Sequence, residues 1–193
     1  MKDSGIAIIF KSKNTVFTSR DLAILWGINN YGYLRSRIEY YIKNGYLYRI
    51  YHGLYAKDRN NFNLFEAANK LRVPSYISLE SVLASESVIF QKYSSVFLVS
   101  YAPKTIKIAH SEFVYKKIKD IILFNPAGII NKESYFIASK ERAFLDALYL
   151  YKNYHFDNLR QIDWNKVEEL LPVYNTAALN KRVKEYRKNA GSK

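Results

Sequence analysis

Basic, hydroxyl and amide side chains recur between positions 20 and 57, and their types suit contacts with phosphates and base edges. A guanidinium can donate two parallel hydrogen bonds to a phosphate or to guanine, and a hydroxyl can bond a phosphate oxygen. An amide side chain can pair with adenine. The candidate DNA-binding residues are Arg20, Asn30, Tyr33, Arg35, Ser36, Arg37, Arg49, Tyr51, His52 and Lys57. Their chemistry is recognition of a polyanion.

The sequence lacks the residue patterns that catalysis and metal binding need. The chain has 3 His and no Cys, which excludes disulfides, thiol catalysis and thiolate zinc sites. The histidines His52, His110 and His155 do not have metal-ligand spacing. Glu141 and Asp146 fall roughly 140° apart around one expected helix, so they do not form a catalytic pair. We therefore expect no catalytic residue, no metal, no cofactor and no enzymatic activity.

A nuclease is the enzymatic alternative. It would need acidic and lysine side chains brought together from scattered positions, and no spacing in the sequence favours this arrangement. Its candidate residues are Glu112, Asp120, Lys132 and Lys140.

A large excess of positive charge accompanies these residues. The chain has 30 Lys and Arg against 17 Asp and Glu, a formal net charge of +13. This excess favours a polyanionic partner, either nucleic acid or an anionic membrane surface. Residues 1–57 carry +6 of it and residues 181–193 carry +5. The apolar runs are far shorter than the roughly 20 residues of a membrane span, and no signal-peptide pattern begins the chain. We expect a cytoplasmic protein without a membrane partner.

Capping residues predict where two helices of the first domain begin and end. Thr18 is a good N-cap residue, Asp21 places a carboxylate in the first turn, and Gly27 ends the helix. A second helix is expected from Tyr31 to Lys43. Its inward face has the spacing i, i+4, i+7 and i+8 and consists of Leu34, Ile38, Tyr41 and Ile42.

Two short aromatic-rich runs follow the second helix. Tyr46–Ile50 and Leu54–Ala56 flank a glycine turn, a pattern that predicts a β-hairpin. We expect Tyr40, Tyr46 and Tyr48 to pack in the core or the sheet and not to contact DNA.

The order of these elements is that of a winged helix-turn-helix domain over residues 1–57, with a first helix expected over Ser4–Phe10. In such a domain the second helix of the pair enters the major groove and the hairpin follows the DNA backbone. Arg20 would contact a phosphate beside the first helix of the pair. The alternative is a protein-docking module in which the basic helix face is only solvated.

Residues 58–193 predict a small mixed α/β domain, so the whole chain belongs to the α+β class. A linker helix over 58–73 stops before Pro74, and Ser78 and Ser139 are expected to cap two further helices. Strands are expected at 96–100, 105–109, 113–117, 121–124 and 135–138. Residues 151–193 form a helical tail with Leu179, Val183 and Tyr186 inward. Its basic end either grips nucleic acid or is simply solvated.

Three segments in this order resemble the AbiEi family of antitoxins. The run GYLYRIYHGLYA at 45–56 resembles the family's hairpin, with its pattern G-x-L-x-R followed by G-x-Y. The run PSYISLESVL at 74–83 resembles its proline-led strand entering a serine-capped helix. The run IASKERAFLD at 137–146 resembles its A-x-x-E-[KR]-A-x-x-D helix. After Tyr151 the chain matches no motif of the family.

The resemblance implies an antitoxin of a type IV toxin–antitoxin pair from bacterial abortive-infection (phage defence) systems. In that family the winged helix binds inverted repeats of double-stranded promoter DNA and represses its own operon. The C-terminal part counteracts a nucleotidyltransferase toxin without forming a stable complex with it. Two alternatives remain open: a winged-helix regulator without a cognate toxin, and the nuclease.

Overall fold

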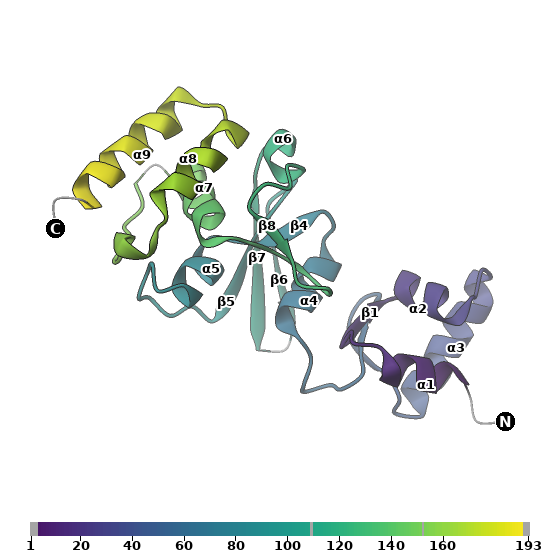
Figure 1. Cartoon of the computed structure of the whole chain (residues 1–193). Helices are drawn as coiled ribbons and strands as arrows, with labels where there is room; N and C mark the ends of the chain where they lie inside the picture. Colours follow the sequence, from purple (N-terminus) through teal and green to yellow (C-terminus); the bar gives the residue numbers. More distant parts are fainter. Residues whose placement is uncertain (1–3, 109, 152, 191–193) are drawn as a thin grey trace. The chain divides into compact units, whose positions relative to one another are not determined.

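The computed structural model describes residues 4–108, 110–151 and 153–190 and is an α+β structure, as the sequence predicts (Figure 1). The chain divides into two compact units, Met1–Leu71 with Ile108–His110, and Arg72–Lys107 with Ser111–Lys193. Ala109, in the strand predicted at 105–109, and Lys193, in the predicted basic tail, lie outside the described residues.

The first unit consists of short helices packed with a small antiparallel sheet. Its elements are α1 (Ser4–Lys11), β1 (Val16–Thr18), α2 (Ser19–Trp26), α3 (Tyr31–Lys43), β2 (Tyr48–Tyr51), β3 (Leu54–Ala56) and α4 (Leu64–Leu71). The strands pair in the order β1-β3-β2. Tyr51 ends β2 and so belongs to the strand, which leaves His52 and Gly53 as the hairpin turn.

Local capping fixes the ends of α2 and α3. The Thr18 hydroxyl accepts the Asp21 N–H at 3.0 Å and the Asp21 carboxylate accepts the Thr18 N–H at 2.9 Å, which together form a capping box. Gly27 then takes a left-handed φ of 64°. Asn30 caps α3 by accepting the Tyr33 N–H at 2.9 Å. The predicted boundaries of both helices are confirmed.

The apolar core of the first unit lies between its first three helices and the sheet. Leu34, Ile38 and Tyr41 are buried and Ile42 is partly buried, as the predicted spacing requires. The other buried members of this core are Ile9, Phe17, Leu22, Ile28, Leu47 and Tyr55.

Tyr40, Tyr46 and Tyr48 stay outside the core and are exposed, but Tyr48 lies in β2 and the rings of Tyr40 and Tyr46 pack edge-on against Tyr41. Tyr40 is 56% exposed, whereas its neighbour in the helix, Tyr41, is fully buried. Successive residues of a helix point about 100° apart, so the core accepts only one of this pair.

Helix α4, which we expected to be a linker, packs within the first unit. The buried Glu66 carboxylate accepts the N–H and the hydroxyl of Thr15 at 2.8 and 2.7 Å. The Lys70 ammonium lies 3.0 Å from Asp21 Oδ2 and 3.1 Å from Glu66 Oε1. These interactions extend the unit past the boundary expected after residue 57.

The second unit has a six-stranded mixed sheet with helices against it. Its elements are β4 (Ser75–Ile77), α5 (Glu80–Ser85), β5 (Ser95–Ser100), β6 (Lys104–Ile108), β7 (Ser111–Lys117), α6 (Asp120–Leu123), β8 (Ile129–Asn131), β9 (Phe136–Ala138), α7 (Lys140–Leu150), α8 (Trp164–Leu170) and α9 (Ala177–Ala190), with 3₁₀ turns at Leu159–Gln161 and Leu171–Val173. The strand order is β6-β7-β5-β4-β9-β8.

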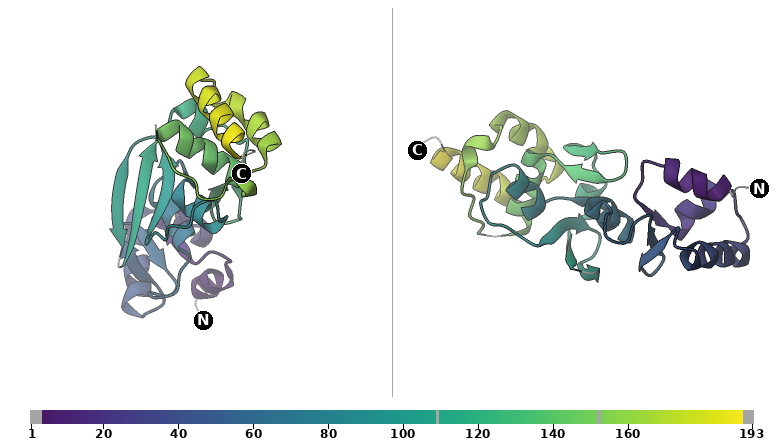
Figure 2. Two further views of the ribbon diagram at one scale, coloured as in Figure 1. Left: turned by 90° about the vertical axis from the view of Figure 1, so that its left-hand side faces the viewer. Right: turned by 90° about the horizontal axis from the view of Figure 1, so that it is seen from below.

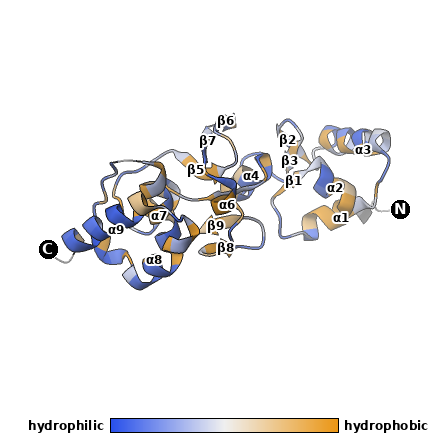
Figure 3. Cartoon of the chain, turned by 90° about the horizontal axis from the view of Figure 1, so that it is seen from above, coloured by the Kyte–Doolittle hydropathy of each residue, from blue (hydrophilic) through white to orange (hydrophobic). Residues whose placement is uncertain are grey.

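The β5–β7 and β4–β9 pairs of this sheet are parallel, and the central β4–β5 pair and the β8–β9 pair are antiparallel. Helices α5 and α7 pack beside the sheet, and α8 and α9 lie against α7 (Figure 2). Leu179 and Val183 of α9 are buried, which confirms the predicted inward face of the tail at these two positions. The rest of α9 is largely hydrophilic (Figure 3).

Two predictions for the second unit are wrong. Residues 121–124 were expected to form a strand and lie instead at α6, where the Ile122 carbonyl accepts Arg142 Nη2 at 2.7 Å. Ser78 does not cap α5, because its hydroxyl donates to Asp146 Oδ2 at 2.7 Å. Ser139 does cap α7, by accepting the Arg142 N–H at 3.2 Å, as predicted.

Candidate nucleic-acid interface

A groove of about 290 Å³ lies between α3 and the β2–β3 turn of the first unit. Three of the predicted DNA-binding residues line it: Arg35 from α3, Arg49 from β2 and His52 from the turn. The walls also include Tyr31 and Glu39, which sequence reasoning missed. The hairpin and the helix therefore present cationic and hydrogen-bonding groups to one shared space.

The exposed face of α3 carries further predicted residues. Tyr33 is 58% exposed, and Arg35 and Ser36 are exposed beside it. The Ser36 hydroxyl donates to the Gly32 carbonyl at 3.1 Å, so it can still accept one hydrogen bond from a ligand. Asn30 uses its side-chain oxygen as the cap of α3, which leaves its NH₂ group as the remaining donor.

Arg37 lies beside Tyr33 and Ser36, but it is less exposed than they are. Its guanidinium lies over the Trp26 ring at 5.1 Å, and its Nη2 is 3.3 Å from the Tyr41 hydroxyl. The side chain is half-buried against the α1 side of the unit, close to Gly5. Arg37 and Arg35 are two positions apart and so point about 200° apart around the helix axis. Arg35 and Arg37 therefore lie on different sides of α3, and Arg37 lines a separate shallow pocket with Tyr33, Ser36 and Tyr40.

Arg49 is held at the groove by an acidic neighbour. Its guanidinium donates to the Glu39 carboxylate of α3 and lies 5.8 Å from the centre of the Tyr55 ring. The hydrogen bond to Glu39 raises the pKa of Arg49 above its ordinary value. About half of each charged side chain is exposed, so the ion pair is open to water and to competing anions.

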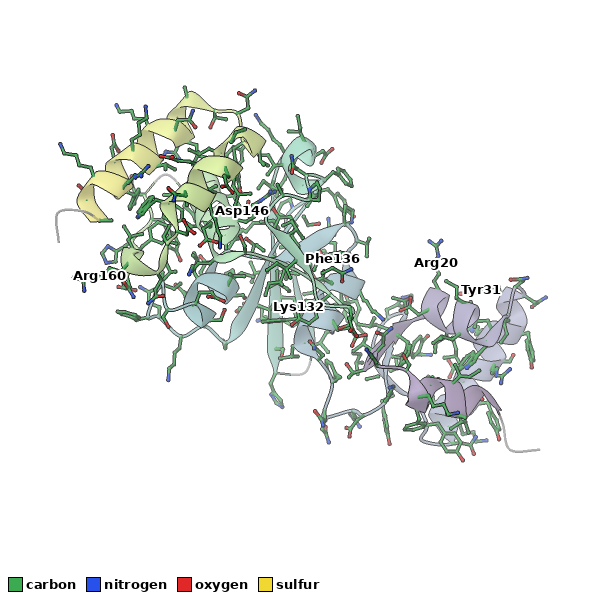
Figure 4. All side chains as sticks on the ribbon, viewed as in Figure 1. Arg20, Tyr31, Lys132, Phe136, Asp146 and Arg160 are labelled. Atoms are coloured by element: carbon green, nitrogen blue, oxygen red, sulfur yellow. The ribbon has the colours of Figure 1, made fainter. Side chains whose placement is uncertain are left out.

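The remaining predicted residues lie around this surface in different ways. Lys57 turns inward, donates to the Ser12 carbonyl and lies 5.7 Å from the Phe17 ring, and burial lowers its pKa. It is therefore part of the fold and not an open phosphate contact. Arg20, on the first turn of α2, is exposed and extends away from the ribbon (Figure 4). Tyr51 is also exposed.

Asp146 is sealed inside the second unit and is not open to a substrate. Its Oδ1 accepts the Tyr174 hydroxyl at 2.6 Å and lies 3.5 Å from Arg142 Nε, and both charged side chains are fully buried. Burial raises the pKa of Asp146, and Arg142 and the surrounding hydroxyls oppose that rise. Arg142 also donates to the Ala127 carbonyl at 2.7 Å. This closed network joins α7 to its neighbours.

Among the described residues, no group of three or more His, Asp or Glu side chains is placed to hold a metal ion. No helix there has the length and apolar character to cross a bilayer. Neither a protein-family model nor a curated protein matches the chain.

Proposed function

We propose that the chain is a DNA-binding transcription regulator and that its first unit is a winged helix-turn-helix. The order of α1, β1, α2, α3 and the β2–β3 hairpin supports this, as does the short turn between α2 and α3. In this arrangement α3 enters the major groove and the hairpin lies along the backbone.

The observation that carries the proposal is the shared groove of α3 and the hairpin. Arg35 would reach base edges or a phosphate from α3, while Arg49 and His52 would contact the backbone from the hairpin. The first unit has eleven basic and five acidic residues over 1–71, a net charge of +6 that favours association with duplex DNA.

The resemblance to the AbiEi antitoxins extends the proposal to an operon. The regulator would bind inverted repeats upstream of its own gene and repress transcription, and its C-terminal unit would counteract a nucleotidyltransferase toxin. A nucleotidyltransferase reading frame beside the gene, whose toxicity is relieved by co-expression of this chain, is the expected result. Absence of such a frame favours a regulator without a toxin.

DNA binding is tested with fluorescence anisotropy on the DNA upstream of the gene. We expect a salt-sensitive affinity that falls for scrambled DNA of the same length, and Arg35→Ala should weaken it by roughly 5- to 100-fold. Arg59→Ala is the matched control, because Arg59 is an exposed arginine of the same unit outside α3 and the hairpin. Equal affinity for scrambled DNA would overturn the operator proposal.

Arg37→Ala distinguishes a binding role from a packing role. Because Arg37 stacks on Trp26 and Tyr41, its loss should lower the free energy of unfolding by about 1–2 kcal/mol. Arg35→Ala should change it by less than about 0.5 kcal/mol. Urea denaturation of both variants measures this difference. A reversed order would mean that the two arginines are wrongly assigned.

A further inference from the structure

The second unit contains a separate groove of about 660 Å³ between residues 154–161 and α9. We propose that this groove binds single-stranded nucleic acid, with a nucleobase stacked on its aromatic wall. Its volume falls within the roughly 300–1,000 Å³ of sites that hold small ligands. The proposal is independent of the duplex-binding surface, because the two grooves share no residue.

The aromatic wall is held in place before any ligand arrives. Tyr154 and Phe156 have ring centroids 4.8 Å apart, and those of Phe156 and Tyr186 are 5.4 Å apart. The Tyr186 hydroxyl donates to the Tyr154 carbonyl, which ties α9 to the segment before it. Phe156 is buried, while Tyr154 and Tyr186 remain half-exposed to the groove. A fixed aromatic surface stacks a base at low entropic cost.

Phe90 adds an exposed ring at the edge of this groove. Its side chain is 66% exposed, yet its backbone N–H donates to Asp157 Oδ2 at 2.8 Å. The N–H groups of Asp157 and Asn158 both donate to the Val88 carbonyl at 3.0 Å. The loop is therefore fastened to the groove wall while the ring stays in water. A phenylalanine held in this way offers a second stacking surface.

Polar groups around the aromatic wall match the edges of a nucleotide. Gln161 and Asn189 supply amide groups that can both donate to and accept from a base edge, whereas Asn158 accepts the Arg160 N–H at 3.2 Å and keeps its NH₂ group as a donor. Arg160 extends outward from the 3₁₀ turn beside them and supplies a guanidinium suited to a phosphate (Figure 4). The carboxylate of the groove, Asp157, is already engaged by the Phe90 N–H.

Helix α9 gives this groove a basic surrounding. Its residues 181–188 include five cations and one acid. Arg182 donates to the Leu148 carbonyl and Arg187 pairs with Glu168, so these two fix the helix in place. Lys181 and Lys184 are exposed on other sides of α9, about 140° and 200° around the helix axis from Tyr186, so their charge favours the approach of a polyanion without lining the groove. An unstacked base is needed to reach the aromatic wall, which favours a single strand over a duplex.

The test uses the full chain and fluorescein-labelled single-stranded RNA and DNA of one sequence. We expect at least one of the two strands to bind. Phe90→Ala should weaken that binding about 10-fold, because one base loses its stacking surface. Arg160→Ala should also weaken it and make its salt dependence shallower. The matched controls are Phe124→Ala, because Phe124 directly follows α6 and is 67% exposed, and Lys132→Ala (Figure 4). Both should keep the wild-type affinity.

Competition identifies the form of the ligand. Displacement of the labelled strand by adenosine monophosphate at equal base concentration would support a free nucleotide, and displacement only by strands would support a polymer. Photo-crosslinking of a 4-thiouridine strand should label peptides containing Tyr154 or Tyr186. The proposal fails if no single strand binds at low salt. It also fails if Phe90→Ala binds like the wild type, or if Arg35→Ala abolishes single-strand binding.

Discussion

Glu39 and Arg49 come from different elements and meet at the groove of the first unit, where a phosphate would also have to bind. Under the proposed function, the carboxylate would therefore compete with DNA for the guanidinium. An exposed ion pair of this kind contributes only about 0.2–1 kcal/mol to stability. Its position at the groove points to a role in restraining binding and not in holding the fold together.

We predict that Glu39→Gln strengthens binding to duplex DNA. Removal of one negative charge from the groove should raise the affinity at low salt by roughly 3- to 10-fold. Because Arg49 becomes available to a phosphate, the slope of log affinity against log salt should steepen by up to about 1. Anisotropy titrations over a range of salt concentrations measure both quantities.

Glu86→Gln serves as the control for this experiment, because it removes the charge of an exposed glutamate in the second unit. Its affinity and salt slope should equal those of the wild type. A weaker affinity for Glu39→Gln would mean that Glu39 positions Arg49 for DNA and does not compete for it.

At the scale of the elements, the start of α5 places an acidic side chain in a poorly solvated position. Glu80 is buried, and its Oε2 accepts no hydrogen bond. Burial raises the pKa of this carboxyl group above its ordinary value. The hydroxyls of Tyr151 and Tyr154 and the charge of Lys116 partly oppose the rise. The ionised carboxylate is thus less stable in the folded chain than in the unfolded one.

This gives a prediction for the pH dependence of stability. For an acid whose folded pKa is raised, the free energy of unfolding falls as pH rises from the unfolded pKa, near 4.5, through the folded pKa. Glu80→Gln should remove this fall, so the variant gains stability relative to the wild type at neutral pH and less near pH 3. Urea denaturation at several pH values measures it. An equal difference at all pH values would contradict the prediction.

Elements fixed by neighbouring residues were the predictable part of the fold. The caps Thr18, Asn30 and Ser139 each act on the backbone N–H three positions further on, so their sequence context was sufficient. Ser78 had the same local context but donates to Asp146, 68 positions away. The apolar segment 121–124 likewise lies at a helix and not in a strand. Arg142 donates a hydrogen bond to its Ile122 carbonyl, which a strand would use to pair with its neighbour. Such distant partners leave no local signal.

The candidate site was likewise predictable only where neighbouring residues determine the structure. The spacing on α3 predicted its buried face correctly, and the 200° separation of Arg35 from Arg37 could have been used to place them on different sides. The pairing of Glu39 with Arg49 depends on how the hairpin folds back on α3, which no sequence spacing encodes. Lys57 illustrates a further difficulty, because a lysine at a hairpin flank can equally turn toward a carbonyl of its own fold.

At the scale of the whole molecule, the division into two units predicts that the first one folds alone. Residues 1–71 include α4, whose Glu66 and Lys70 side chains bond to Thr15 and Asp21. A fragment ending at residue 57 lacks these partners. Loss of hydrogen bonds to a buried charged group should lower its free energy of unfolding by roughly 3 kcal/mol or more. In so small a unit this is a large share of the stability.

We therefore expect fragment 1–71 to unfold cooperatively in urea and to bind upstream duplex DNA within a few-fold of the full chain, but not single strands. Fragment 1–57 should be largely unfolded at the same temperature, because its apolar core is too small to offset the lost α4 contacts. Circular dichroism and anisotropy on both fragments measure these outcomes.

In fragment 1–71, Glu66→Gln should reproduce part of the loss, since glutamine keeps the shape but not the charge that Lys70 pairs with. If fragment 1–57 were as stable as 1–71, α4 would be a linker after all. If 1–71 bound single strands as well as the full chain does, the groove beside α9 would not be their site.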